Sequence, residues 1–212
     1  MDFFTSDLHF GHFNVIKWCN RPFSSVDEMN EELIKRWNET VKDTDTVYVV
    51  GDMCLCRSNI AETYVKRLNG YKILIKGNHD RGEKTMLKMG FDEFHKKLTY
   101  EMPDGRRALI QHRPVSKCLI GDHDLLIHGH IHITENFKDR VNVSCDMWDF
   151  KPVSIEEITI LGLDKINDID AVDISFDGNR VIINADITTE NFSGVVDHIY
   201  TQIIDIWPGG KK

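Results

Sequence analysis

Histidine, aspartate and asparagine side chains gather in five short clusters between residues 7 and 132. Imidazole nitrogens, carboxylate oxygens and an amide oxygen form a mixed donor set that suits borderline-hard divalent cations rather than a thiolate-bound ion. One carboxylate shared by two such ions would hold them about 3.5–4 Å apart, the separation used in two-metal hydrolysis of phosphate esters. In chain order the clusters are Asp7 with His9, Asp52, Asn78 with His79 and Asp80, His112, and His130 with His132.

Each cluster alone is weak evidence. An Asp-x-His pair is more often structural than a pair of ligands, and Gly-Asp at a strand end is common. The segment Gly129-His130-Ile131-His132 is stronger, because two imidazoles at i and i+2 can both face one ion. The whole set in this order therefore carries the prediction.

Short apolar runs precede the clusters and must position them. Runs of this kind are typical of strands in a sheet that is covered on both faces. Because ligands bind at the carboxyl ends of neighbouring strands in such sheets, we expect the five clusters to converge in space. The predicted strands cover residues 2–6, 46–50, 71–76, 108–111 and 124–127.

Helices are predicted between the first strands. Ser25 and Glu28 are spaced as a capping box, in which each side chain would bond the other residue's amide, and an apolar face at helical spacing follows as far as Val41. A second helix is expected over about residues 60–68, ending at Asn69-Gly70, and a third over about 83–89, ending at Gly90. The alternation indicates an α/β fold that becomes rich in strands after about residue 94.

The last fifty residues have a pattern of their own. Alternating apolar residues on both sides of Asp177-Gly178-Asn179 predict a β-hairpin, and a helical stripe then runs from Phe192 to Trp207. Residues 163–212 carry nine acidic and four basic side chains. We therefore predict a domain over residues 1–162 and an acidic ββα extension over residues 163–212.

Composition narrows the choice of partners. The chain has 212 residues and a formal net charge of −8, which disfavours polymeric nucleic acid as a partner. The sequence has no apolar run of membrane-spanning length and no signal-peptide pattern, so a cytoplasmic protein without a membrane partner is expected. Its five cysteines include no CxxC pair and are interpreted as reduced thiols.

The order D-x-H, GD, GNHD, H and GHxH resembles that of the calcineurin-like metallophosphoesterases. It is formed here by Asp7-Leu8-His9, Gly51-Asp52, Gly77-Asn78-His79-Asp80, His112 and Gly129-His130-Ile131-His132. Val143-Ser144-Cys145-Asp146, followed by Lys151-Pro152-Val153, also looks like the end of small bacterial and phage members. The resemblance extends to about Ile158 and implies a four-layer α/β/β/α sandwich.

The resemblance also implies a ligand set for two divalent metal ions. Manganese is the favoured metal, with iron, zinc, nickel and cobalt as alternatives. Asp52 would bridge the two ions. The first ion would be held by Asp7, His9, Asp52 and His132, and the second by Asp52, Asn78, His112 and His130.

The resemblance assigns the chemistry as well. A hydroxide bridging the two ions would attack the phosphoester, and His79 would act as the general acid that protonates the leaving alkoxide. Asp80 would hold the His79 imidazole in the correct tautomer and raise its pKa.

Other residues near the motifs are candidates for substrate contacts. The segment Gly11-His12-Phe13-Asn14 resembles the GHxN of small family members, so His12 and Asn14 are candidates for contact with the phosphate or for support of the ligands. Arginines beside the motifs could clamp a phosphate, although each alone is more simply a surface residue. Of these, Arg81 and Arg113 directly adjoin proposed site residues, whereas Arg21 and Arg57 lie farther along the chain. His128 is expected to support the site or to lie in the core.

The leading functional prediction is a metal-dependent phosphohydrolase. A phosphodiester of a small nucleotide is slightly favoured, because a leaving alkoxide of high pKa needs the acid that His79 would supply. A phosphomonoesterase and a catalytically silent binding module on the same fold are the alternatives. The extension could also mediate formation of a homo-oligomer.

Overall fold

The computed structural model describes residues 1–132, 136–137, 139–164, 172–177 and 180–185. The chain divides into two compact units, Met1–Gly162 and Leu163–Lys212. In the part of the chain that is described, none of the helices combines the length and the apolar character needed to cross a membrane.

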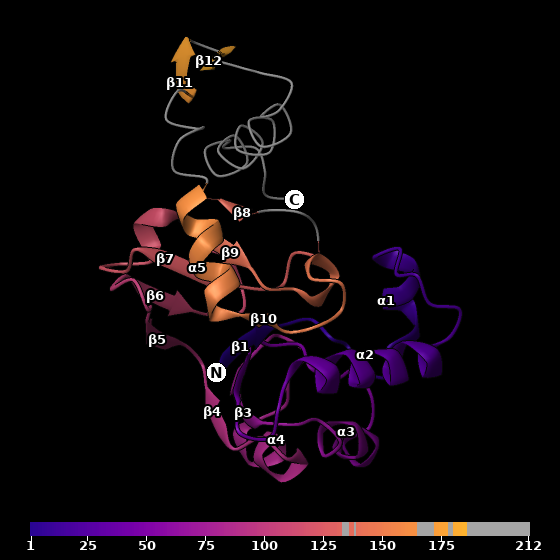
Figure 1. Ribbon diagram of the computed structural model, residues 1–212. Helices are drawn as coiled ribbons and strands as arrows, with labels where there is room; N and C mark the ends of the chain where they lie inside the picture. Colours follow the sequence, from indigo (N-terminus) through magenta and orange to yellow (C-terminus); the bar gives the residue numbers. More distant parts are fainter. Residues whose placement is uncertain (133–135, 138, 165–171, 178–179, 186–212) are drawn as a thin grey trace. The chain divides into compact units, whose positions relative to one another are not determined.

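The first sheet of the first unit carries three of the predicted strands (Figure 1). Its order is β10-β1-β2-β3-β4, in which β1 to β4 are parallel and β10 pairs antiparallel with β1. The carboxyl ends of β1, β2 and β3 therefore meet at one edge. The strands are β1 (Asp2–Thr5), β2 (Thr46–Val49), β3 (Tyr71–Ile75), β4 (Glu93–His95) and β10 (Val153–Ser154).

The second sheet carries the other two predicted strands, in the order β5-β6-β7-β9-β8. The central strands β6, β7 and β9 are parallel, and antiparallel strands flank them on both sides. Its members are β5 (Leu98–Glu101), β6 (Arg107–Ile110), β7 (Leu125–His128), β8 (Asn136–Phe137) and β9 (Arg140–Asn142).

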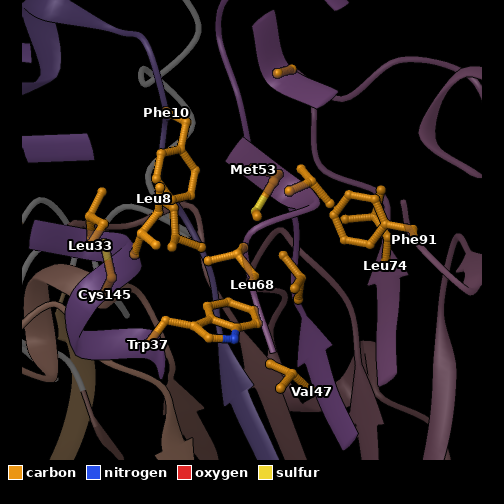
Figure 2. Packing of buried hydrophobic residues seen from close by; sticks show 14 of the residues in the cluster. Leu8, Phe10, Leu33, Trp37, Val47, Met53, Leu68, Leu74, Phe91 and Cys145 are labelled. Carbon is orange, nitrogen blue, oxygen red and sulfur yellow. The ribbon is translucent and has the colours of Figure 1, made fainter. Parts of the chain in front are cut away.

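Helices cover the first sheet on one face. They are α1 (Phe13–Trp18), α2 (Val26–Thr40), α3 (Ser58–Val65) and α4 (Glu83–Met89), and α5 (Ile155–Asp164) follows β10. Trp37 of α2 and Val47 of β2 belong to the apolar cluster between these helices and the sheet (Figure 2). The mixed α/β fold is therefore as predicted.

A second apolar cluster joins the two sheets. Side chains alternate along each strand, so that Phe3 packs toward the helices whereas Phe4 packs, with Ile110 and Ile127, between the sheets. The opposite face of the second sheet contributes Leu109 to a small cluster with Ile120. The described residues of the first unit thus form two sheets flanked by helices, and the complete four-layer arrangement stays a prediction.

Local signals placed α2, α3 and α4 with small errors. The Ser25 hydroxyl accepts the Glu28 amide at 3.1 Å, as predicted, but the Glu28 carboxylate accepts the amide of Ser24 instead of that of Ser25. Gly90 ends α4 in the left-handed conformation, with φ of 114°. Helix α3 ends at Val65, three residues earlier than predicted, and the helices α1 and α5 were not predicted at all.

The second unit contains the predicted hairpin. Strands β11 (Val172–Asp177) and β12 (Arg180–Ala185) pair antiparallel, with Val172 opposite Ala185. The helix predicted between Phe192 and Trp207 lies outside the described residues.

Candidate metal centre

Five loops that follow β1, β2, β3, β6 and β7 bring the predicted clusters together. Backbone hydrogen bonds tie neighbouring loops to one another: the Asp7 amide donates to the Gly51 carbonyl at 3.0 Å, and the His9 amide to the Asp52 carbonyl at 3.1 Å. In the second sheet, the Gly129 amide donates to the His112 carbonyl at 3.0 Å. The convergence predicted from the strand pattern is therefore present.

Several of these loops hold their functional residues in an unusual backbone conformation. Asp7, His9, Asp52 and His130 have φ of 57°, 53°, 54° and 71°, which lie in the left-handed region that residues with a Cβ rarely adopt. Strain of this kind costs of order 1–3 kcal/mol per residue and gathers at functional sites. The hydrogen bonds between the loops hold these residues in place.

Two glycines allow the loops to approach one another closely. A Cβ atom on Gly77 would collide with the Asp52 carboxylate, and one on Gly129 would lie 2.5 Å from Asp7 Oδ2. The glycines of the GNHD and GHxH motifs are thus required by space at the two carboxylates.

Asp7, His9 and His132 form the first group of candidate ligands. Asp7 Oδ2 accepts the Ser6 hydroxyl at 2.6 Å and the His130 amide at 2.8 Å, whereas the buried Asp7 Oδ1 has no hydrogen-bond partner. That free oxygen lies 3.9 Å from His9 Nε2 and 3.7 Å from His132 Nε2. A cation between these three atoms would satisfy the orphaned oxygen.

Asp52, His112 and His130 form the second group, with Asn78 beside them. His112 Nδ1 donates to the Val50 carbonyl at 2.8 Å, which leaves the Nε2 lone pair directed at the site. His112 Nε2 lies 3.1 Å from Asn78 Oδ1 and 3.3 Å from Asp52 Oδ2. The His130 ring is centred 5.1 Å from that of His112.

Asp52 lies between the two groups. Its Oδ2 is 3.9 Å from His9 Nε2 of the first group as well as 3.3 Å from His112 Nε2 of the second. Its Oδ1 accepts the His79 amide at 2.8 Å, which fixes the carboxylate orientation. A single oxygen therefore faces both groups of imidazoles.

The electrostatics of the site favour a bound cation. Burial raises the pKa of Asp7, whereas at Asp52 the opposing effect of burial is outweighed by the His112 hydrogen bond and charge, so that its pKa falls to about 2. Burial lowers the pKa of His9 to about 3, which keeps its imidazole neutral and able to donate a lone pair. Buried carboxylates facing imidazole nitrogens are a donor set that fits divalent metal ions.

A buried ion pair behind the first group orients one ligand. Asp146 Oδ2 accepts His132 Nδ1 at 2.7 Å, and Arg21 holds both oxygens of Asp146 at 2.7 and 2.8 Å. Arg21 also donates to the Asp7 carbonyl at 2.7 Å. A carboxylate on the far nitrogen of a ligating histidine fixes its tautomer and ring orientation.

The sequence did not predict the pairing of Arg21 with Asp146. Arg21, considered there as a surface residue or a phosphate clamp, is 4% exposed and pairs with Asp146. Asp146 was assigned no role, because it lies fourteen residues after His132 and this spacing matches no metal-binding motif. Cys19 was likewise missed, although its thiol lies in one group with His132 and Asp146.

The first unit also matches known proteins. A family model described as calcineurin-like phosphoesterase matches residues 3–168 of this chain. The chain belongs to the calcineurin-like phosphoesterase family. Phosphoester hydrolysis and divalent metal binding are general properties of this family, and the two groups of candidate ligands agree with metal binding.

Relatives of this calcineurin-like phosphoesterase come from an archaeon, phages and a bacterium. The uncharacterized protein MJ1445 of Methanocaldococcus jannaschii is 38% identical over 166 residues, which are 74% of this chain and 88% of that protein. The gene 66 protein of Mycobacterium phage L5 is 38% identical over 80 residues, 36% of this chain and 38% of its own. The crystal structure of the protein of unknown function AQ665 from Aquifex aeolicus superposes with a TM-score of 0.64 at 29% identity, covering 76% of this chain and 98% of that one.

The two predicted catalytic residues are placed differently. The half-exposed His79 side chain lies at the site, with Nε2 3.9 Å from Asp52 Oδ2. Asp80 does not orient it, in contrast to the prediction. Asp80 Oδ2 accepts the amides of Asp52 and Gly77 at 2.9 and 2.8 Å, and Oδ1 accepts the Met53 amide at 3.1 Å. Asp80 therefore holds the Asp52 and Gly77 loops together.

Of the four candidate substrate-binding residues, His12 and Arg113 lie near ligands of the site. The His12 ring is centred 5.7 Å from that of His9, and the charge of Arg113 acts on His130. Arg81 is exposed and donates to the Cys56 carbonyl at 3.3 Å, whereas Asn14 is exposed on α1. Arg57 is exposed at the start of α3.

His128 lies in the core of the second sheet, one of the two positions predicted for it. It is fully buried, and burial lowers its pKa to about 4, so that it is neutral. The five cysteines are all free thiols, as expected.

Proposed function

We propose that this protein is a dinuclear metal-dependent phosphohydrolase, and that phosphodiesters of small nucleotides are its favoured substrates. The observation that carries the proposal is the position of Asp52 Oδ2, which faces His9 Nε2 at 3.9 Å and His112 Nε2 at 3.3 Å. One carboxylate oxygen between two groups of ligands is the arrangement that two adjacent ions require.

The chain offers ligands for both ions. The first would be held by Asp7, His9, Asp52 and His132, and the second by Asp52, Asn78, His112 and His130. When bound, the two cations supply a nucleophile at neutral pH and neutralise charge on the phosphoryl oxygens. Manganese is the ion we favour for this set of nitrogen and oxygen donors.

His79 is the proposed general acid. Its amide is fixed on Asp52 Oδ1, while its half-exposed imidazole can reach the ester oxygen of a bound substrate. There it would donate its proton to the leaving alkoxide. The leaving group of a nucleotide phosphodiester is such an alkoxide, and this diester is the substrate that we favour.

Two alternatives keep the same fold. A phosphomonoesterase would use the same ligands on a different ester. A silent binding module is disfavoured, because every ligand position and the proposed acid are occupied by residues competent for the chemistry.

The proposal is tested by stripping the protein of metal, adding back Mn²⁺, and measuring hydrolysis of bis-p-nitrophenyl phosphate and p-nitrophenyl phosphate. We expect Mn²⁺-dependent turnover of the diester that exceeds turnover of the monoester. Turnover of the monoester alone would support the phosphatase alternative. Two bound metals with no turnover of either ester would support the binding module.

A further inference from the structure

We propose that the exposed indole of Trp18 forms a stacking surface for the aromatic base of a nucleotide whose phosphate is bound at the candidate metal centre. The inference rests on the proposed function and names the part of the substrate that the metal ligands do not contact. Nothing in the sequence motifs pointed to this residue.

Helix α1 lies along the side of the centre that holds the first group of ligands. Just before the helix, the His12 ring is centred 5.7 Å from that of His9. Just after it, the Cys19 thiol lies in one group with His132 and Asp146. The short helix thus extends between two ligands of the first group, and its side chains border the site.

Trp18, the last residue of α1, contacts His12 at the edge of the site. Its ring is centred 5.4 Å from that of His12 at an interplanar angle of 78°, so that the two rings meet edge to face. Trp18 is 71% exposed, the largest fraction among the exposed large hydrophobic side chains of the described residues. The His12 contact therefore orients the indole while leaving most of it open to a ligand.

His12 connects the indole to the catalytic side of the site. The His9 ring is centred 5.7 Å from that of His12 and 5.6 Å from that of His79, so His9 lies between His12 and the proposed acid. Its Nδ1 atom is buried without a hydrogen-bond partner in the described structure. A ligand that extends from the metal centre to Trp18 would pass this ring.

A nucleobase fits this position better than other groups found on phosphoesters. Indole offers a planar apolar face that stacks on any base, and each such stack contributes measurably to binding. In a nucleotide, a ribose lies between the base and the phosphate. In this structure, two successive ring contacts, from Trp18 to His12 and from His12 to His9, lie between the indole and the metal centre. The net charge of −8 disfavours a polymer, so the ligand is a small nucleotide.

The test compares two chromogenic diesters with the same leaving group: the p-nitrophenyl ester of thymidine 5′-phosphate and methyl p-nitrophenyl phosphate. With the Mn²⁺-loaded full chain, we expect Trp18→Ala to raise the ratio of the thymidine KM to the methyl KM by about 5- to 50-fold. Trp18→Phe should restore most of the ratio, because phenylalanine keeps an aromatic face.

Phe13→Ala is the matched control. Phe13 is an aromatic residue of the same helix, is 63% exposed, and makes no ring contact with a site residue in the described part of the chain. Its substitution should leave the KM ratio unchanged. An unchanged ratio in Trp18→Ala, or an equal increase of both KM values, would overturn the proposal.

Binding separates this inference from the proposed function. If the Mn²⁺-loaded protein hydrolyses neither ester, the proposed function fails, and calorimetric titration with thymidine 5′-phosphate and methyl phosphate then decides the role of Trp18. Tighter binding of thymidine 5′-phosphate that is lost in Trp18→Ala would support the stacking surface. Equal affinities in wild type and Trp18→Ala would reject it.

Discussion

At the residue scale, His79 and Asp52 have different proposed roles, as the general acid and as the bridging metal ligand. His79 Nε2 lies 3.9 Å from Asp52 Oδ2 with its side chain half exposed, whereas the Asp52 side chain is almost completely buried. An exposed imidazole can exchange protons with substrate and solvent, while a buried carboxylate can hold cations. Substitution of each residue should therefore have a different signature.

His79→Ala should reduce kcat by roughly 10²–10⁴-fold, the usual contribution of a general acid, without loss of bound metal. The decrease should be larger for a diester with an alkyl leaving group than for one with p-nitrophenolate, which needs no proton. Steady-state kinetics on both esters, with metal content by elemental analysis, measures this. His95→Ala, a histidine paired with Glu93 in β4, is the control. Full activity of His79→Ala on the alkyl ester would refute the assigned role.

Asp52→Asn should lower the occupancy of both ions rather than one. The amide removes the negative charge that faces His9 and His112. Elemental analysis after dialysis against Mn²⁺ gives the number of ions per chain. A variant that still holds two ions would contradict the bridging position.

The sequence predicted which candidate ligands converge, because they come in short motifs at the ends of recognisable strands. It could not predict the roles of Arg21 and Asp146, which contact each other across 125 positions of the chain. It also assigned Asp80 a different partner, because proximity in sequence to His79 does not determine from which groups the carboxylate accepts hydrogen bonds.

At the element scale, one buried arginine joins segments that are far apart in the chain. Arg21 lies between α1 and α2 and contacts both the loop after β1, through Asp7, and the 3₁₀ turn Cys145–Met147, through Asp146. Strand and helix patterns predicted the strands that precede the site loops and the helices α2 to α4, because apolar periodicity is local. The short helix α1 escaped prediction, since six residues provide too little periodicity.

Arg21→Met should lower the free energy of unfolding by about 3–5 kcal/mol, because it leaves Asp146 buried without its main cationic partner. Arg36→Met is the matched control. It removes a more exposed pair with Asp149, and we expect a loss of about 0–1 kcal/mol. Urea unfolding of both variants gives the difference. Equal destabilisation by the two substitutions would contradict the role of Arg21.

At the scale of the whole molecule, all the candidate ligands belong to the unit Met1–Gly162. The apolar clusters of the described residues also lie in this unit. A chain that ends at Asp164, after α5, should therefore fold, bind Mn²⁺ and hydrolyse bis-p-nitrophenyl phosphate at a rate within a few-fold of the full chain. Thermal unfolding and activity of the shortened chain check this. Loss of activity in a folded, metal-loaded chain would assign the extension a part in the site.

In the proposed mechanism, the Asp52 carboxylate would join two metal ions that act together on a phosphoester. The most direct test is the rate of bis-p-nitrophenyl phosphate hydrolysis by metal-free protein during titration with Mn²⁺. We predict negligible activity without metal and a plateau at two equivalents per chain. A plateau at one equivalent of Mn²⁺, or two tightly bound ions with no turnover, would contradict the dinuclear mechanism.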